Sequence, residues 1–453
     1  MFHDALSRSQ QIIRSVVVVG LLSCLAVQPS PGQGITGRID GTVSDSEDQA
    51  PVSAQVYYPP PDSAGGWRTL ADPGQVRQVA GIDVNRLDGA FEYAKRTSQH
   101  GGLLVIRRGW LVYERYFGRA SRDVTPSTAS IGKTFTAIAC GIMLRDHRDR
   151  LPDGLDTKVF TRTYLPDAFP LSDPRKADIT LGQLLAMSSG MSEYASGGAP
   201  PTVPRFGYVD SEAVPLAPGP AADPSLGRDL RALRAPMWTA PGGGYVYSTS
   251  ATHVLSILVH GVTGQLMEDY LREKLATPMQ WGPWGWPPSA DGTPQTNTPG
   301  GGGVAVRATD MLRYGYMLLH KGRSGNQQLV PASFIEHASR PSPYNPHTMY
   351  SFQFTSNQDG HLAGAPRDAY FKSGTNGYGL YVVPSLDLVV WKIGGVDAQY
   401  QWTARGLPQN VPYDGSRATW RLHPHDQFHD PPPDVETGVR RTLELVVSAV
   451  VDY

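Results

Sequence analysis

Ser130-Ile131-Gly132-Lys133 opens the most apolar helical segment of this chain, which we expect to run from residue 131 to about residue 146. In a helix, residues three positions apart lie on one face, so this spacing places the Lys133 amine beside the Ser130 hydroxyl. A serine hydroxyl needs a neighbouring base to act as a nucleophile at neutral pH. The apolar stripe of the segment consists of Ile131, Phe135, Ile138, Ala139, Ile142 and Met143.

Two further polar motifs follow along the chain. Tyr247-Ser248-Thr249 comes after a run of three glycines and before a segment that we expect to be helical from residue 251. A tyrosine beside ammonium groups can carry protons, and Tyr247 is preferred over Tyr245 because Ser248 and Thr249 complete a Tyr-x-polar pattern. Lys372-Ser373-Gly374-Thr375 leads into a strand over residues 377–383 and supplies a second cation and a backbone N–H donor.

The three motifs, in this order, resemble the S-x-x-K, Y-x-N and K-T-G elements of penicillin-recognising serine enzymes. The chain is thereby identified as similar to the class C β-lactamase-like serine hydrolases, which include esterases, D-aminopeptidases and 6-aminohexanoate-dimer hydrolases. The resemblance implies an α/β fold, with an antiparallel sheet flanked by helices and an inserted all-α lobe. It also implies a catalytic mechanism without a cofactor. In that mechanism Ser130 is the nucleophile, Lys133 its base and Tyr247 the proton shuttle.

The resemblance extends to the substrate-binding groups, with two departures. The N–H groups of Ser130 and Thr375 would form the oxyanion site, and Lys372 and Gly374 belong to the same motif. Thr249 stands where the family has asparagine, and Ser373 where it has threonine. Because the class A Glu-x-x-x-Asn segment is also missing, we expect a small ester or amide substrate. The alternatives are a β-lactamase or penicillin-binding activity, a D-amino peptidase, and a penicillin-binding sensor that acylates without turnover.

The elements indicate one large hydrolase domain. Residues 102–114 read as a hairpin, and residues 377–383 and 388–393 as two strands. The hydrolase domain would span residues 81–450, with the helical lobe inserted at about 147–298. Tyr194, Trp238 and Trp281 are expected to border the pocket, because they lie in loops next to the motifs.

The N-terminus reads as an export signal over residues 1–26, with Arg8 and Arg14 before a short apolar run. Cys24 lies in a sequence that also resembles a lipoprotein box, which leaves open a lipid anchor at this residue. Residues 27–80 are expected to form a linker or an N-terminal arm. The predicted location is therefore the periplasm or the outside of the cell, with or without membrane attachment.

Composition argues against other classes of protein. Forty basic and 41 acidic residues give a net charge of −1, with no basic stripe that would bind nucleic acid. An α/β-hydrolase would need Gly-x-Ser-x-Gly, and the nearest match, Gly190-Met191-Ser192, has tyrosine at position 194. A metal enzyme built on His423, His425 and His429 is a weaker alternative, because prolines make this stretch a loop. We therefore expect no metal.

Overall fold

A computed structural model describes residues 57–192, 226–287, 296–401 and 437–453, and the structural statements below concern these residues. They all belong to the unit Gly41–Tyr453. Several expectations fall outside the described residues and stay predictions: the export signal 1–26, the anchor at Cys24, the role of Tyr194, and the histidines of the stretch 421–429.

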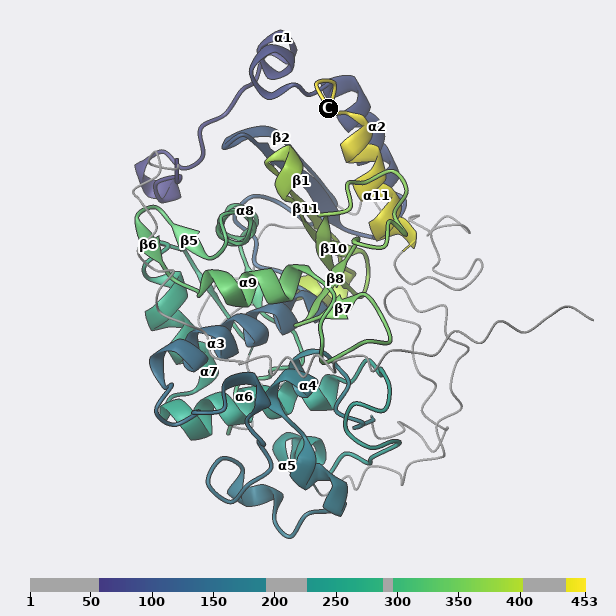
Figure 1. The fold of residues 1–453 in the computed structure, drawn as a ribbon. Helices are drawn as coiled ribbons and strands as arrows, with labels where there is room; N and C mark the ends of the chain where they lie inside the picture. The colour runs from purple at the N-terminus through teal and green to yellow at the C-terminus, as the bar shows by residue number, and fades with distance from the viewer. Residues whose placement is uncertain (1–56, 193–225, 288–295, 402–436) are drawn as a thin grey trace, which may run out of the picture. The chain divides into compact units, whose positions relative to one another are not determined.

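A seven-stranded antiparallel sheet forms the centre of the fold (Figure 1). The strand order is β2-β1-β11-β10-β9-β8-β7. β1 pairs with β11 in the register Gly102↔Ile393, so the early hairpin and the late strands share one sheet. The bounds of the strands in this order are Trp110–Phe117, Gly101–Arg107, Leu388–Ile393, Tyr378–Val383, Tyr370–Gly374, Phe354–Ser356 and Tyr350–Ser351.

Both faces of the sheet are covered by helices, because its central strands carry apolar residues on both sides. Leu103 and Val105 of β1 pack in one core with α2 (Val84–Ala94) and α11 (Thr437–Ser448). Leu104 and Ile106 pack in the second core, which also contains α8 (Ala308–Leu319). Figure 1 shows α2 and α11 side by side on one face of the sheet and α8 on the other. The antiparallel sheet with flanking helices confirms the predicted fold class.

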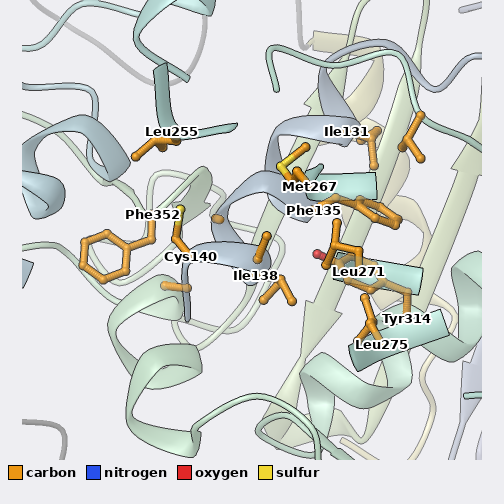
Figure 2. Packing of buried hydrophobic residues seen from close by; sticks show 14 of the residues in the cluster. Ile131, Phe135, Ile138, Cys140, Leu255, Met267, Leu271, Leu275, Tyr314 and Phe352 are labelled. Carbon is orange, nitrogen blue, oxygen red and sulfur yellow. The ribbon is translucent and has the colours of Figure 1, made fainter. Parts of the chain in front are cut away.

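The helix after Ser130 lies at the centre of the helical region. It is α3 (Gly132–Asp146), and it packs against α6 (Thr249–Thr263) and α7 (Met267–Leu271). Figure 2 shows its apolar side chains among those of α6, α7 and α8. The sequence predicted a single apolar stripe, but α3 is buried on nearly all sides. Its threonines fit this environment because Thr134 and Thr136 donate their hydroxyl protons to backbone carbonyls.

The other helices follow their sequence signals closely. Thr180 caps α4 (Leu181–Leu185) with a capping box, as predicted, and Gly264 ends α6 in the left-handed conformation. No helix within the described ranges is long and apolar enough to cross a membrane. The remaining elements are α1 (Pro73–Gln75), α5 (Arg228–Leu233), α9 (Ala332–Ser339), α10 (Asp397–Gln401), and the strand pairs β3 (Trp284–Gly285) with β4 (Ala305–Val306) and β5 (Arg323–Ser324) with β6 (Gln327–Gln328).

The part of the expected N-terminal arm that the structure describes, residues 57–80, packs against α8. Trp67 is buried, its indole N–H donates to the Thr309 carbonyl at 3.2 Å, and its ring meets the ring of Tyr316 edge-on. Asp62 accepts a hydrogen bond from the buried Arg313 at 2.8 Å. This segment is therefore fastened to the body of the fold, although its composition had indicated a linker.

Candidate active site

Ser130 lies in a sharp turn just before α3, formed by Ala129–Ile131, and this turn contacts β9 and β10. Ala129 has a φ of 50°, a left-handed conformation that is uncommon for a residue with a side chain. The N–H of Gly303 donates to the Ala129 carbonyl at 2.9 Å and helps to hold the turn. Ser130 itself is half-buried, so the turn presents its hydroxyl at the edge of the core.

Lys133 reaches back to Ser130 as the spacing predicted. Its Nζ donates to Ser130 Oγ at 3.1 Å and to the carbonyl oxygen of Gly301. The Lys133 side chain is almost completely buried, at 1% exposed, and its Nζ lies 4.9 Å from the centre of the Tyr247 ring. The hydroxyl and the amine are therefore in contact in a site from which bulk water is largely excluded.

Tyr247 connects this pair to the second lysine. Lys372 Nζ donates to the Tyr247 hydroxyl at 3.1 Å and lies 4.5 Å from its ring centre. The loop that carries Tyr247 is fixed by Val246, whose N–H donates to the Met187 carbonyl, and by Ser248, which caps α6. The structure thus brings together Ser130, Lys133, Tyr247 and Lys372, which are far apart in the sequence.

Tyr350 is a fifth member of the site that the sequence did not indicate. Its hydroxyl accepts a hydrogen bond from Lys372 Nζ at 2.9 Å and donates to Gln353 Oε1 at 2.9 Å. Gln353 is fully buried, and its amide N–H₂ donates in turn to the Leu185 carbonyl. Lys372 therefore lies between two phenols. Because Tyr350 belongs to a two-residue strand, it carried no periodicity that could have singled it out.

The Lys372-Ser373-Gly374-Thr375 motif belongs to β9 and the turn after it, whereas the sequence placed it ahead of the strand. A Cβ on Gly374 would lie 2.9 Å from the Thr128 carbonyl oxygen, so a glycine is needed where β9 meets the Ser130 turn. Ser373 is half-buried, and Thr375 is exposed at the start of the β9–β10 turn. This contact brings the backbone at Thr375 near the turn that carries Ser130.

The run of glycines at residues 300–303 lies directly behind the site, and its Gly301 carbonyl is the one that Lys133 contacts. A Cβ on Gly301 would meet the side chain of Thr249 at 2.3 Å, and one on Gly302 would meet the Ala129 carbonyl at 2.6 Å. Thr249 is therefore beside the glycine loop at the first residue of α6. The four consecutive glycines were a visible signal in the sequence, but their contact with Lys133 was not predicted.

The aromatic residues expected at the pocket lie in different surroundings. Trp238 lies against Gly244, three residues before Tyr247, where a Cβ would be 2.5 Å from its ring. Trp281 packs edge-on against Phe135 and Trp284 and is part of the apolar packing around α3. Within the described ranges, no three His, Cys, Asp or Glu side chains are grouped closely enough to hold a metal ion.

Comparison with known proteins agrees with this geometry. Three solved structures share the fold. One, described as a 6-aminohexanoate-dimer hydrolase from Bacillus anthracis, has a TM-score of 0.54 at 19% identity, over 75% of this chain and 84% of that one. Another, described as a β-lactamase from Bacteroides dorei, has 0.54 at 17%, over 81% and 99%. EstCE1, a hydrolase with promiscuous acyltransferase activity, has 0.53 at 17%, over 69% and 93%.

A family model gives the assignment that these distant likenesses cannot give alone. The model named Beta-lactamase matches residues 90–391, which is more than half of the 453-residue chain. The matched range contains Ser130, Lys133, Tyr247, Tyr350 and Lys372. The chain therefore belongs to the Beta-lactamase family.

Proposed function

We propose that this protein is a serine hydrolase that cleaves a small ester or amide through an acyl-enzyme on Ser130. The observation that carries the proposal is the contact of 3.1 Å between Lys133 Nζ and Ser130 Oγ in a nearly dry site. A hydroxyl nucleophile with an amine base in hydrogen-bond reach is the arrangement that acyl transfer requires. The family assignment and the contact between Tyr247 and Lys372 support the same conclusion.

In the acylation step, the neutral amine of Lys133 takes the proton of Ser130 as Oγ attacks the substrate carbonyl carbon. The resulting oxyanion is bound by the backbone N–H groups of Ser130 and Thr375, which meet where β9 contacts the Ser130 turn. The C–O or C–N bond of the substrate then breaks. The leaving group takes a proton from the hydroxyl of Tyr247.

In the deacylation step, the Tyr247 phenolate takes a proton from water, and the resulting hydroxide attacks the acyl carbon. The ammonium group of Lys372, 3.1 Å from the Tyr247 oxygen, stabilises the phenolate between the two steps. Collapse of the second tetrahedral intermediate releases the acid, and Ser130 recovers its proton through Lys133. No other reactant than water is needed.

Labelling with a fluorophosphonate probe tests the nucleophile directly. We expect one adduct per chain, located on the peptide that contains Ser130, and no adduct in Ser130→Ala. Ser373→Ala is the matched control, because it removes a hydroxyl that lies at the same site and should still be labelled. An adduct on another residue, or an unchanged adduct in Ser130→Ala, would contradict the proposal. Steady hydrolysis of a small activated ester then separates an enzyme from a penicillin-binding sensor, which would acylate without turnover.

Tyr350→Phe is expected to lower kcat about tenfold, because it removes one of the two phenols that hold Lys372. A hydrogen bond to a charged group contributes about 1.5 to 3 kcal/mol, and 1.4 kcal/mol corresponds to a factor of ten. The measurement is steady-state ester hydrolysis beside a thermal melt. Tyr164→Phe, which removes a hydroxyl bonded to the Arg150 carbonyl at the surface, should leave kcat unchanged. A wild-type kcat in Tyr350→Phe would mean that Lys372 does not depend on this phenol.

A further inference from the structure

A buried chain of hydrogen bonds runs from α5 to the glycine loop 300–303, outside the groups used above. His253 on α6 is 3% exposed, and its Nε2 lies 2.7 Å from Asp229 Oδ1 on α5. The N–H of Gly300 donates to His253 Nδ1 at 3.1 Å. The next residue, Gly301, offers its carbonyl to Lys133 Nζ. Three hydrogen bonds and one peptide unit therefore connect Asp229 to the base.

The partners of His253 define its tautomer. A backbone N–H can only donate, so Nδ1 must present its lone pair to Gly300, and the ring proton must lie on Nε2 and point to Asp229. Asp229 is suited to accept it. Although burial acts in the opposite direction, hydrogen bonds from His253 and Asn297 hold the pKa of the Asp229 carboxyl below its ordinary value. A neutral imidazole oriented by a carboxylate is thus a fixed acceptor for the loop.

The loop has no side chains of its own to hold it in place. At Gly300, one contact is the N–H to His253, and another is the carbonyl, which accepts from the Thr136 hydroxyl of α3 at 2.7 Å. Loss of the His253 acceptor would leave the Gly300 N–H buried and unsatisfied, which costs about 1 to 3 kcal/mol unless the loop moves. Movement of Gly300 carries the adjoining Gly301 carbonyl with it.

We propose that His253, oriented by Asp229, is a positioning residue for the catalytic lysine. It holds the glycine loop so that the Gly301 carbonyl takes one N–H of Lys133, and this contact directs the amine toward Ser130 Oγ. The proposal rests on the proposed function, because it assigns Lys133 the role of base. A base that is misplaced by about 1 Å loses up to 100-fold in rate without a matching loss in substrate binding.

Two substitutions of His253 separate the acceptor from the bulk of the ring. His253→Asn places an amide oxygen at the position of Nδ1 and can still accept from Gly300. His253→Gln reaches the position of Nε2, so it keeps a partner for Asp229 and loses the acceptor for Gly300. We expect His253→Gln to lower kcat for a small activated ester about 30- to 100-fold with KM within twofold, and His253→Asn to keep kcat within about threefold.

Two more variants complete the experiment. Thr136→Val removes the donor to the Gly300 carbonyl and is expected to lower kcat in the same way, which keeps the test valid if His253→Gln does not fold. His260→Gln is the control, since His260 is on the same helix and bonds to Asn297 rather than to the loop. We expect its kcat to be that of the wild type.

The outcomes distinguish this inference from the function on which it rests. If Ser130→Ala still hydrolyses the ester, the proposed function fails. If Ser130→Ala is inactive while His253→Gln and Thr136→Val keep the wild-type kcat, the positioning role alone is overturned. Equal losses of kcat in His253→Asn and His253→Gln would also overturn it, because the acceptor at Gly300 would then not be what matters.

Discussion

Lys133→Met is expected to lower kcat/KM for a small activated ester by about 10⁴-fold, as far as Ser130→Ala does. The two groups act as one unit, since the hydroxyl attacks only as the amine 3.1 Å away takes its proton. The double variant should therefore be no slower than either single one. Methionine keeps the length of the side chain and places no charge in a site where Lys133 is 1% exposed. The measurement is kcat/KM for the two single variants and the double variant.

The control for this result is stability. Because methionine suits a buried position, Lys133→Met should melt within a few degrees of the wild type, so the lost activity cannot be due to unfolding. Two results would be inconsistent with the base role. One is a kcat/KM within tenfold of the wild type in Lys133→Met. The other is a double variant that is slower by the product of the two single effects.

Arg313→Met is expected to lower the free energy of unfolding by about 3 to 5 kcal/mol, because it breaks a buried ionic network. The Arg313 side chain is fully buried and donates to Asp310 Oδ1 and to Asp62 Oδ1, each at 2.8 Å. Asp310 is also fully buried and would keep Arg307 as its remaining cationic partner. Removal of the guanidinium leaves carboxylates in the interior with too little positive charge. Urea unfolding measures the loss.

The same network gives the pH dependence its sign. Although burial acts against it, hydrogen bonds from Thr309 and Arg313 and the charge of Arg313 hold the pKa of Asp62 below its ordinary value of 3.8. A carboxyl whose pKa is lowered on folding contributes stability above its unfolded pKa and loses that contribution as the pH falls through its folded pKa. We therefore expect the difference between the wild type and Arg313→Met to shrink below about pH 4.

The matched control is Arg441→Met on α11, whose pair with Glu444 lies at the surface. Exposed pairs of this kind contribute about 0 to 1 kcal/mol. If Arg313→Met also cost less than 1 kcal/mol, the network would not fasten residues 57–70 to α8 as described.

The local parts of the fold could be predicted from the sequence, because their signals lie within a few residues. The apolar spacing after Ser130 predicted α3, and the same spacing predicted that Lys133 would contact Ser130. Arg108-Gly109 predicted the β1–β2 hairpin, and both residues have the positive φ that a tight turn between strands uses. Thr180 predicted the start of α4.

The parts that depend on long-range packing could not be predicted in this way. Tyr350 meets Lys372 only because β7, β8 and β9 are neighbours in the sheet, and β7 and β8 are too short to show alternation. His253 lies in an ordinary helical pattern, and its contact with Gly300 depends on how the loop returns to α6. Residues 57–70 are rich in Pro, Gly and Asp, and their anchors are two separate residues, Trp67 and Asp62.

The pairing of β1 with β11 has a consequence for synthesis of the protein. Gly102 pairs with Ile393, so one edge of β1 waits for a strand about 290 residues later, which takes about 15 to 60 s of translation. Until then, a buried apolar strand has a free row of N–H and C=O groups, which is a template for wrong pairing between chains. Correct folding of the nascent chain therefore requires that this edge be kept apart from other chains, by a chaperone or by dilution, until the last strands emerge from the ribosome.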